Sequence, residues 1–524
     1  AYVGDWETSS DYSITTTYTC PAAPTPEFNV ASGSILNPSD NITITSGQAG
    51  VTYYYTTAEN TDPVNPTPSS SKLDSTTGWI ISITGSETRI KIYAVQPGKF
   101  DSPIVMFTYK LRVPAPVVAA PSTGGVWFGQ TKLVTMSQGA GAPAGAEIRY
   151  TATVSPGTPA DPSASDSLYT APVSLDRSRN YKFRAFKTGW EPSTVVPANY
   201  NVKHVYTAVV AVGILHIYRD NQEIHTFNNG SITTVEDVCV KNGKIFVCGR
   251  AGTTAYLYIY HGGDSQSFNG NLDRGEIAKA VYVSGNYVYV LVNNTSAETS
   301  WVYKCRATVS DGADAVGENQ VKCGINETPI IGHDLVYVDD SHLYVSGLFK
   351  NAGEFLPVII DNHTTGSLYI TLSSTNSSNY AGKMVYDGTN LHVIGKGVYS
   401  GSPQTAYWKV RCSDFTLNTS NYQGGLIDLY DISRDETTGV IRILAYNGSG
   451  YPVYDENFTQ HGTVLGTQPT GIRVIGANTW AIGGHQVNVD VCYTYNGGAS
   501  YDFLSPPLSA GYHAMDVSGD YISN

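Results

Sequence analysis

The sequence predicts an all-β protein in which two small β-sandwiches are followed by a seven-bladed β-propeller. Three observations support this fold class. A hairpin pattern recurs after residue 235, another strand pattern occurs twice between residues 25 and 203, and amphipathic helical periods are absent. Hairpins that recur at intervals of about 40 to 50 residues are typical of propellers, with one hairpin for each four-stranded blade.

Each copy of the hairpin pattern alternates apolar and polar residues, turns at Gly, Asn or Asp, and then alternates again. The clearest copies cover residues 238–247, 281–290 and 336–345. The turns lie near residues 243, 285, 340, 388, 439, 476 and 519. Period-2 runs joined by an Asn-Gly or Asp-Gly turn are β-hairpins. The set of turns therefore predicts seven blades.

The last hairpin, near residue 519, has no outer strands after it up to Asn524. Two earlier segments, Ile214–Tyr218 and Glu223–Phe227, match the later half of a blade. We therefore expect the N-terminal stretch of this domain to pair with the C-terminal hairpin and close the ring, which protects the edge strands. A long open sheet or solenoid is the alternative.

Residues 25–203 contain two copies of a different pattern. A Pro-rich stretch at Pro21–Pro24 precedes the first copy, and another at Pro114–Pro116 separates the two. The first copy contains Val51–Thr56, Asp62, Pro63, Ile90–Ala94, Gly98, Ser102 and Tyr109. The second copy contains Ile148–Thr151, Asp161–Ser163, Tyr181–Ala185, Gly189, Ser193 and Tyr200. Short strand runs with turn residues between them predict small antiparallel sandwiches.

Both copies resemble the chitobiase/β-hexosaminidase C-terminal-like family, through Tyr54-Tyr55-Thr56, Asp62-Pro63 and Lys182–Ala185. The resemblance covers about a third of the chain, and the Ser- and Pro-rich insertions depart from the family pattern. It implies an Ig-like module of bacterial surface and secreted proteins that is not itself catalytic. The expected domains are an extended segment at 1–24, sandwiches at 25–113 and 114–204, and the propeller at 205–524.

The N-terminal segment has a clean alternation that does not fit the sandwich pattern. Tyr12, Ile14, Thr16 and Tyr18 would all lie on one side of a strand. A strand ahead of a Pro-rich linker suits β-augmentation, in which one chain completes a sheet of the next, and repeated head-to-tail contacts make an open filament. A strand of the adjacent sandwich, a tether or a disordered segment are the alternatives.

Composition narrows the class of protein. Only 14% of the 524 residues are charged, against about 25% in typical soluble domains, while the chain holds 38 Tyr and 52 Gly. Such a surface of hydroxyls and amides is common in secreted β proteins. The net charge of −13 and the lack of a basic stripe argue against nucleic acid as a partner. No apolar run is long enough to predict a membrane span.

We expect an extracellular or cell-surface location, because the chain opens at Ala1 as a mature product would after signal-peptide removal. Asn-x-Ser/Thr sequons provide candidate glycosylation sites on such a protein. They are Asn41, Asn229, Asn293, Asn294, Asn326, Asn362, Asn376, Asn418, Asn447 and Asn457.

The seven cysteines include no Cys-x-x-Cys pair, which argues against zinc and thioredoxin chemistry. Cys305 and Cys323 flank a predicted outer hairpin, and Cys239 and Cys248 flank an inner one. Each pair is a disulfide candidate in an oxidising compartment, with buried thiols as the alternative.

Motifs of hydrolases, metalloproteases, phosphate-binding loops and EF-hands are absent, so we expect no catalytic residues, no metal and no cofactor. Tyr and Trp faces can stack on sugars, with Trp127, Trp190, Trp301, Trp408 and Trp480 as candidates, although Trp301 and Trp408 fit a core better.

Three functions compete. The sequence favours a non-enzymatic structural protein that self-assembles into a surface filament or layer through its N-terminal strand, with other copies of itself as partners. A carbohydrate- or protein-binding adhesin that uses the propeller face is the first alternative. A propeller glycosidase or lyase is the second, and the missing motifs argue against it.

Overall fold

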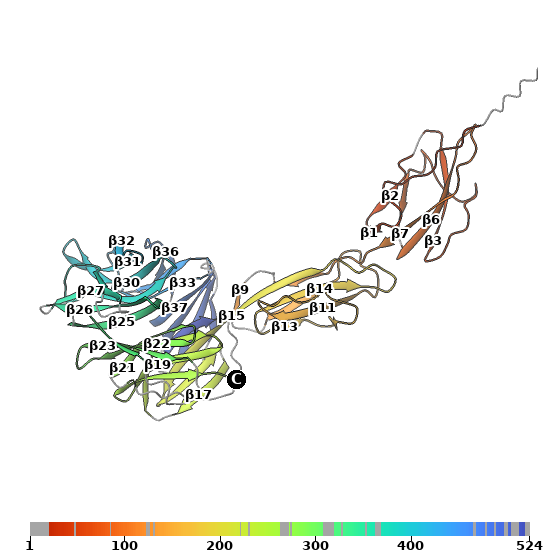
Figure 1. Cartoon of the computed structure of the whole chain (residues 1–524). Coiled ribbons are helices and arrows are strands. Elements are labelled where there is room, and N and C mark those ends of the chain that lie inside the picture. The colour runs from red at the N-terminus through yellow and green to blue at the C-terminus, as the bar shows by residue number, and fades with distance from the viewer. Residues whose placement is uncertain are drawn as a thin grey trace, which may run out of the picture. The chain divides into compact units, whose positions relative to one another are not determined.

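The computed structural model shows a chain built from strands alone (Figure 1). It describes residues 20–524 except 47–48, 84, 122–125, 129–131, 221, 229–230, 263–271, 273–274, 308–318, 326–327, 352–353, 362–367, 437, 465–467, 477–478, 487–488, 497–500, 505–512 and 519–524. Among these residues no helix occurs, so none is available that could cross a membrane. The prediction of an all-β protein is confirmed.

Contacts divide the chain into two compact units. The first unit takes its described residues from the ranges Ala1–Thr123, Leu133–Ser174 and Arg179–Asn199. The second unit takes them from Gly124–Lys132, Leu175–Ser178 and Tyr200–Asn524. The predicted boundary between residues 204 and 205 falls inside one long strand, β15 (Val196–Ala211).

The first unit contains two similar sets of strands, here named repeat A and repeat B. Repeat A pairs β2 with β5 and orders its other strands β1-β7-β6-β3-β4. Its strands are β1 (Ile35–Leu36), β2 (Asn41–Thr43), β3 (Thr52–Glu59), β4 (Ser71–Leu73), β5 (Ile80–Ser82), β6 (Glu87–Val95) and β7 (Val105–Leu111). One core cluster draws residues from both sheets, including Ile42, Ile81, Tyr53 and Tyr109, so the core lies between the sheets.

Repeat B has the sheet β13-β10-β8 and the strand order β12-β11-β14-β15. Its strands are β8 (Val117–Ala120), β10 (Lys132–Ser137), β11 (Glu147–Val154), β12 (Ser167–Leu168), β13 (Val173–Leu175), β14 (Arg179–Phe186) and the start of β15. The short β9 (Val126–Phe128) pairs with β15 in parallel.

The two repeats share a serine that fixes the turn before the final strand. Ser102 Oγ accepts a hydrogen bond from the Ala94 amide at 2.8 Å, and Ser193 Oγ accepts one from the Ala185 amide at 2.8 Å. Because each serine is buried, its hydroxyl satisfies an amide that water cannot reach. The paired Ser and Tyr positions noticed in the sequence are thus structurally equivalent.

The second unit is a β-propeller whose sheets each run outward from a first strand. Two sheets are β18 (Ile232–Lys241), β19 (Lys244–Ala251) and β20 (Thr254–Tyr260), then β21 (Ile277–Ser284), β22 (Tyr287–Asn294), β23 (Thr299–Arg306) and β24 (Asn319–Ile325). The next two are β25 (Thr328–Asp339), β26 (His342–Asn351), β27 (Glu354–Asp361) and β28 (Leu368–Thr371), then β29 (Tyr380–Tyr386), β30 (Asn390–Tyr399), β31 (Ser402–Arg411) and β32 (Thr416–Gln423). Two more are β33 (Asp428–Arg434), β34 (Ile441–Tyr446), β35 (Tyr451–Tyr454) and β36 (Gln460–Val464), then β37 (Gln468–Gly476), β38 (Thr479–Gln486), β39 (Val489–Asn496) and β40 (Tyr501–Leu504).

A remaining sheet joins distant parts of the sequence. The strand β41 (His513–Ser518) pairs with β15, which pairs with β16 (Ile214–Arg219), and β17 (Gln222–Asn228) follows. The expected pairing of the N- and C-terminal parts of this domain is therefore present. The described C-terminal contribution is one strand rather than the predicted hairpin, because β15 takes the second position.

The first strands form a closed cycle of contacts, in which β18, β21, β25, β29, β33, β37 and β41 each touch the next and β41 touches β18. Core clusters lie between successive sheets. The predicted hairpins follow the local turn chemistry. In the first, Asn242 and Gly243 have φ of 55° and 72°, the paired positive values of a type I′ turn.

Removing β41 by ending the chain at residue 512 should expose one edge of β15 and remove Met515 from the core. We expect the propeller to melt at least ~10 °C lower and to aggregate through the open edge. Thermal circular dichroism and light scattering measure both effects. A chain that ends at Ser518 keeps β41 and is the control; equal melting of the two chains would contradict the role given to this pairing.

Candidate functional site

Charged side chains gather at the centre of the propeller, around a cavity of about 660 Å³. The cavity is lined by the inner strands that form the closed cycle of contacts. Six carboxylates line it: Asp237, Asp334, Asp387, Asp431, Glu436 and Asp516. Three cations accompany them: Lys383, Arg434 and Arg473. This cavity is the candidate functional site.

A local irregularity of the inner strands positions three of the carboxylates. The pairing register shifts just before Asp237 in β18, before Asp334 in β25 and before Asp431 in β33. Such a β-bulge adds one residue to the strand and redirects the side chain next to it. The three aspartates recur at intervals of 97 residues, so they occupy alternate sheets of the ring.

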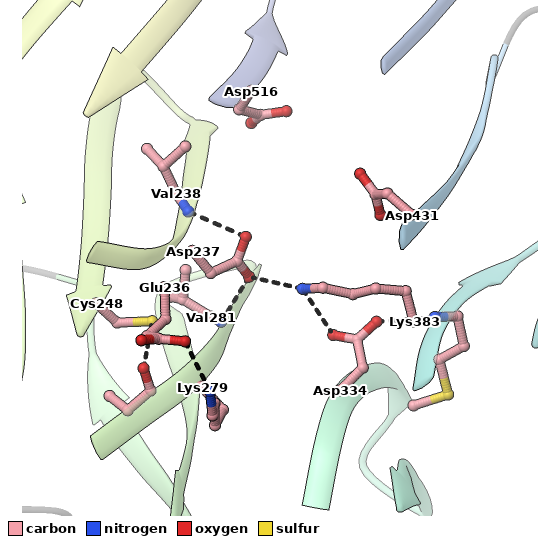
Figure 2. Close-up of polar contacts among 12 residues, drawn as sticks. Glu236, Asp237, Val238, Cys248, Lys279, Val281, Asp334, Lys383, Asp431 and Asp516 are labelled. Atoms are coloured by element: carbon pink, nitrogen blue, oxygen red, sulfur yellow. Dashed lines mark hydrogen bonds and ion pairs between the residues drawn. The ribbon is translucent and has the colours of Figure 1, made fainter. Parts of the chain in front are cut away.

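Each of these carboxylates accepts a hydrogen bond from the backbone of the next inner strand. The Oδ2 atom of Asp237 accepts from the Val281 amide at 3.0 Å, and that of Asp334 accepts from the Met384 amide at 2.8 Å. Figure 2 shows the contacts around Asp237. Two more bonds complete the set: Asp431 Oδ2 with the Ile472 amide at 3.0 Å and Asp516 Oδ2 with the Val240 amide at 2.7 Å. The side chains therefore connect neighbouring sheets that share no backbone ladder at this point.

Two cations bridge the carboxylates. Lys383 Nζ lies 4.0 Å from Asp237 and 3.8 Å from Asp334, and Figure 2 shows it reaching between them. Arg473 Nη1 lies 2.6 Å from Asp431 Oδ2, and its Nε lies 3.5 Å from Asp516 Oδ1. Both cations come from sheets that lack an aspartate at the bulge. Carboxylates and cations therefore alternate along the inner strands from β25 to β41, in the order Asp334, Lys383, Asp431, Arg473 and Asp516.

Burial perturbs the protonation of this cluster. Desolvation raises the pKa of Asp334 to about 6; Lys383 opposes the rise and Asp237 adds to it. Burial by itself lowers the pKa of Lys383, but Asp237, Asp334 and Asp431 together raise it above its ordinary value. The pKa of Arg473 is likewise raised, since Asp431 and Asp516 outweigh the effect of burial. Both cations thus stay charged at neutral pH.

Among the described residues, no group of three or more His, Cys, Asp or Glu side chains is arranged to hold a metal ion. The cavity carboxylates face backbone amides and cations instead. Sequence reasoning missed this cluster. The available signal was an aspartate in the same place ahead of alternate hairpins, in Glu236-Asp237-Val238, His333-Asp334-Leu335 and Tyr430-Asp431-Ile432.

The predicted disulfide between Cys305 and Cys323 is wrong. Cys323 lies opposite Ser300 in the β23–β24 pairing, and Cys305 is five residues further along β23. At about 3.3 Å per residue their Cα atoms are ~16 Å apart, far beyond disulfide reach. Cys239 and Cys248 are thiols as well, so the second predicted disulfide is also wrong. Cys248 lies opposite Asp237 rather than Cys239, which leaves the two cysteines on a diagonal.

The glycosylation candidates divide into several environments. Asn293 is only 3% exposed; its Nδ2 donates to Gly332 O at 2.8 Å and its Oδ1 accepts from Ser300 Oγ at 2.7 Å. This candidate is therefore wrong for the folded chain, since a glycan has no room there. Exposed or partly exposed candidates are Asn41, Asn294, Asn376, Asn418, Asn447 and Asn457. Asn229, Asn326 and Asn362 lie outside the described residues.

The predicted assembly residues Tyr12, Ile14, Thr16 and Tyr18 also lie outside the described residues. Among the tryptophans proposed for sugar stacking, Trp408 and Trp480 are fully buried core residues. Trp190 and Trp301 are partly buried against core clusters. These four therefore serve packing, and the described propeller offers no exposed tryptophan face among them.

No family model matches the sequence, and no curated protein matches it. Solved structures that resemble the chain are propellers at very low identity. Apo AztD from Citrobacter koseri is 10% identical over 61% of this chain and 99% of its own, with a TM-score of 0.39. The β-propeller domain of Swd1 from Myceliophteria thermophila is 11% identical over 49% of this chain and 95% of its own, with a TM-score of 0.30.

The similar structures also include an enzyme. The dihydro-heme d1 dehydrogenase NirN is 9% identical over 59% of this chain and 74% of its own, with a TM-score of 0.35. Likenesses at this level concern the fold alone and say nothing about chemistry.

We expect Asp431→Asn to destabilise the propeller by on the order of 3 kcal/mol, because the asparagine leaves Arg473 in the cavity without its closest carboxylate. Urea unfolding measures the change. Asp414→Asn removes an exposed ion pair with Arg411 and is the matched control, expected to change stability by less than about 0.5 kcal/mol. If both variants lowered the free energy of unfolding equally, the Asp431–Arg473 pair would not have the stabilising role given to it here.

The raised pKa of Asp334 predicts a pH dependence. The unfolded carboxyl titrates near pH 4 and the folded one near 6, so the stability due to its protonation is complete below pH 4 and is lost as the pH rises through 6. Relative to Asp334→Asn, the wild type should lose on the order of 3 kcal/mol between pH 4 and 7. Urea unfolding across this range checks it. A stability difference that does not change with pH would contradict the assignment.

Proposed function

We propose that this chain is a non-enzymatic extracellular structural protein, in which Ig-like sandwiches carry a seven-bladed β-propeller. Repeats A and B are the sandwiches, at 25–113 and 114–204, and the propeller covers 205–524. The cycle of inner strands and the β15–β41 pairing support the seven blades. The main support for a non-enzymatic role is that the central carboxylates bind backbone amides and cations of the protein itself.

The central carboxylates form hydrogen bonds between neighbouring sheets, so few of their oxygen atoms are available to bind a substrate. Asp237 accepts from the amide of Val238 through Oδ1 and from that of Val281 through Oδ2. Asp431 accepts from Ile432 and Ile472 in the same way and also pairs with Arg473. A glycosidase needs two carboxyl groups that are available on either side of a sugar bond. Carboxylates committed to backbone amides support a structural role instead.

Binding at the propeller face is a second candidate, and the central cavity favours it. Carboxylates outnumber cations in its lining, so it suits polar or cationic groups of a glycan or a protein better than anionic ones. A ligand of this site should raise the melting temperature of the propeller by linkage. A structural protein without such a site should show no shift across a glycan panel.

Assembly through the N-terminal strand remains the prediction for how copies join, with Tyr12, Ile14, Thr16 and Tyr18 as the contacts. Negative-stain electron microscopy of the full chain should show regular fibres or layers that disappear in a chain beginning at Pro21. Main-chain pairing of the strand supplies the affinity, and the four side chains fill pockets of the acceptor.

A pair of point variants sharpens this test. Tyr18→Asp places a charge on the predicted buried face of the strand and should abolish assembly. Thr17→Asp changes the opposite face and should leave assembly intact, because alternate side chains of a strand point to opposite sides. Isolated particles in the full chain, or fibres that survive the truncation, would remove the strand from the assembly mechanism.

A further inference from the structure

Two backbone hydrogen bonds join the end of repeat A to a turn of repeat B. The Val113 amide donates to Glu191 O at 2.9 Å, and the Glu191 amide donates to Leu111 O at 3.0 Å. The residues that follow the final strand of repeat A therefore pair with a turn of repeat B. Lys110 and Glu191 add an ion pair at 3.6 Å, and Trp190 packs against the core of repeat A.

The same turn exists in repeat A. Gly98 and Gly189 have φ of 79° and 86°, and both turns are closed by a 3.0 Å backbone bond, from Lys99 to Gln96 and from Trp190 to Lys187. Positive φ at these values favours glycine, which explains its presence in both turns.

The segment before repeat A binds its turn as repeat A binds the turn of repeat B. The Ala23 amide donates to Phe100 O at 2.7 Å, and the Phe100 amide donates to Pro21 O at 3.2 Å. Pro21–Ala23 thus takes the place that Leu111–Val113 takes at Glu191. A Pro-x-Pro linker follows in both cases, at Pro24–Pro26 and Pro114–Pro116.

Apart from the segment that precedes repeat A, no described residue covers the turn Gly98–Phe100 of repeat A as repeat A covers the matching turn of repeat B. A Cβ added at Gly189 would lie 3.4 Å from Ser86 of repeat A, whereas one added at Gly98 would meet no described atom within 4 Å. Phe100, the counterpart of Glu191, is 65% exposed. The turn of repeat A therefore presents the surface that repeat A itself covers on repeat B.

The sequence ahead of the docked segment has the pattern of a final strand. Residues 14–19 align without a gap to Val105–Lys110, with Ile14 at Val105 and Thr17-Tyr18 at Thr108-Tyr109. In both repeats this tyrosine is a core residue: Tyr109 is 0% exposed and Tyr200 is 2% exposed. The linker after Tyr18 is one residue longer than the one after Tyr109.

We propose that residues 14–20 are the final strand of a third β-sandwich of the same kind, and that this sandwich docks on the turn Gly98–Phe100 of repeat A. Residues 14–20 complete a body that is the counterpart of β1–β6, and this body belongs to neither repeat A nor repeat B, because both already hold their own final strands. The inference is an alternative to addition of this strand to another copy of the chain, and it leaves the non-enzymatic structural role proposed above unchanged.

A fusion chain tests this. Residues 25–104, the body of repeat A, are placed directly ahead of residues 14–524, so that residues 14–20 stand where Val105–Leu111 stand in repeat A. We expect the added body to fold and to resist thermolysin at least ~10-fold longer than in the same fusion carrying Tyr18→Asp. Amide exchange at residues 98–101 should slow by at least ~10-fold relative to the unfused chain, because the turn becomes covered.

Two controls keep the result decisive. The fusion with Thr17→Asp alters the outer face and should behave like the parent fusion. A second fusion, with residues 25–111 ahead of residues 21–524, supplies the body with its own final strand and shows that the added sandwich can fold in this place. If that fusion folds while the first is digested as fast as its Tyr18→Asp variant, residues 14–20 are not a final strand. Unchanged exchange at 98–101 in a folded fusion would overturn the docking site.

The outcome also separates this inference from assembly between copies. Fibres of the 524-residue chain that depend on its first 20 residues, together with failure of the fusion, would support assembly and remove the third sandwich. Isolated particles together with a folded fusion would support the third sandwich and would argue against assembly between copies through this strand.

Discussion

A buried carboxylate must find donors, and this requirement ties the sheets of the propeller together. At Asp237, Asp334 and Asp431 a bulge turns the side chain toward the next sheet, where a backbone amide meets it. Leaving such a group unpaired costs more than its hydrogen bond gains, so the spacing of neighbouring inner strands is narrowly constrained. The outer strands of each sheet then follow from ordinary ladder pairing onto a fixed first strand.

The two cations contact their aspartates at different distances. Arg473 contacts Asp431 at hydrogen-bond distance, whereas Lys383 stands 3.8 to 4.0 Å from each of its two aspartates. The guanidinium group can satisfy two carboxylates with directed donors, and the ammonium group acts as a point charge between them. Asp334 therefore has a longer ion pair than Asp431. Burial raises the pKa of Asp334, and Lys383 opposes this rise only in part.

Sequence patterns identified features that depend on near neighbours. Alternation and the Asn242-Gly243 turn gave the hairpins, and the equivalent Ser102 and Ser193 marked the two repeats. Features that depend on register or on distant strands were missed. The Cys305–Cys323 pair failed because flanking a hairpin does not fix which residues face each other. The Asn293 sequon failed because its amide bonds to Gly332 on the next sheet, and the central cluster was missed because its members are 97 residues apart.

The long strand β15 also has a mechanical consequence. Tension transmitted along the chain reaches the propeller through this strand, which is paired with β16 on one edge and with β41 on the other. Its hydrogen bonds lie across the direction of the strand, so a pull along β15 loads two ladders in shear at once. Many bonds must then break together rather than one after another. The sheet that joins the two ends of the domain is in this way also the element that resists its extension.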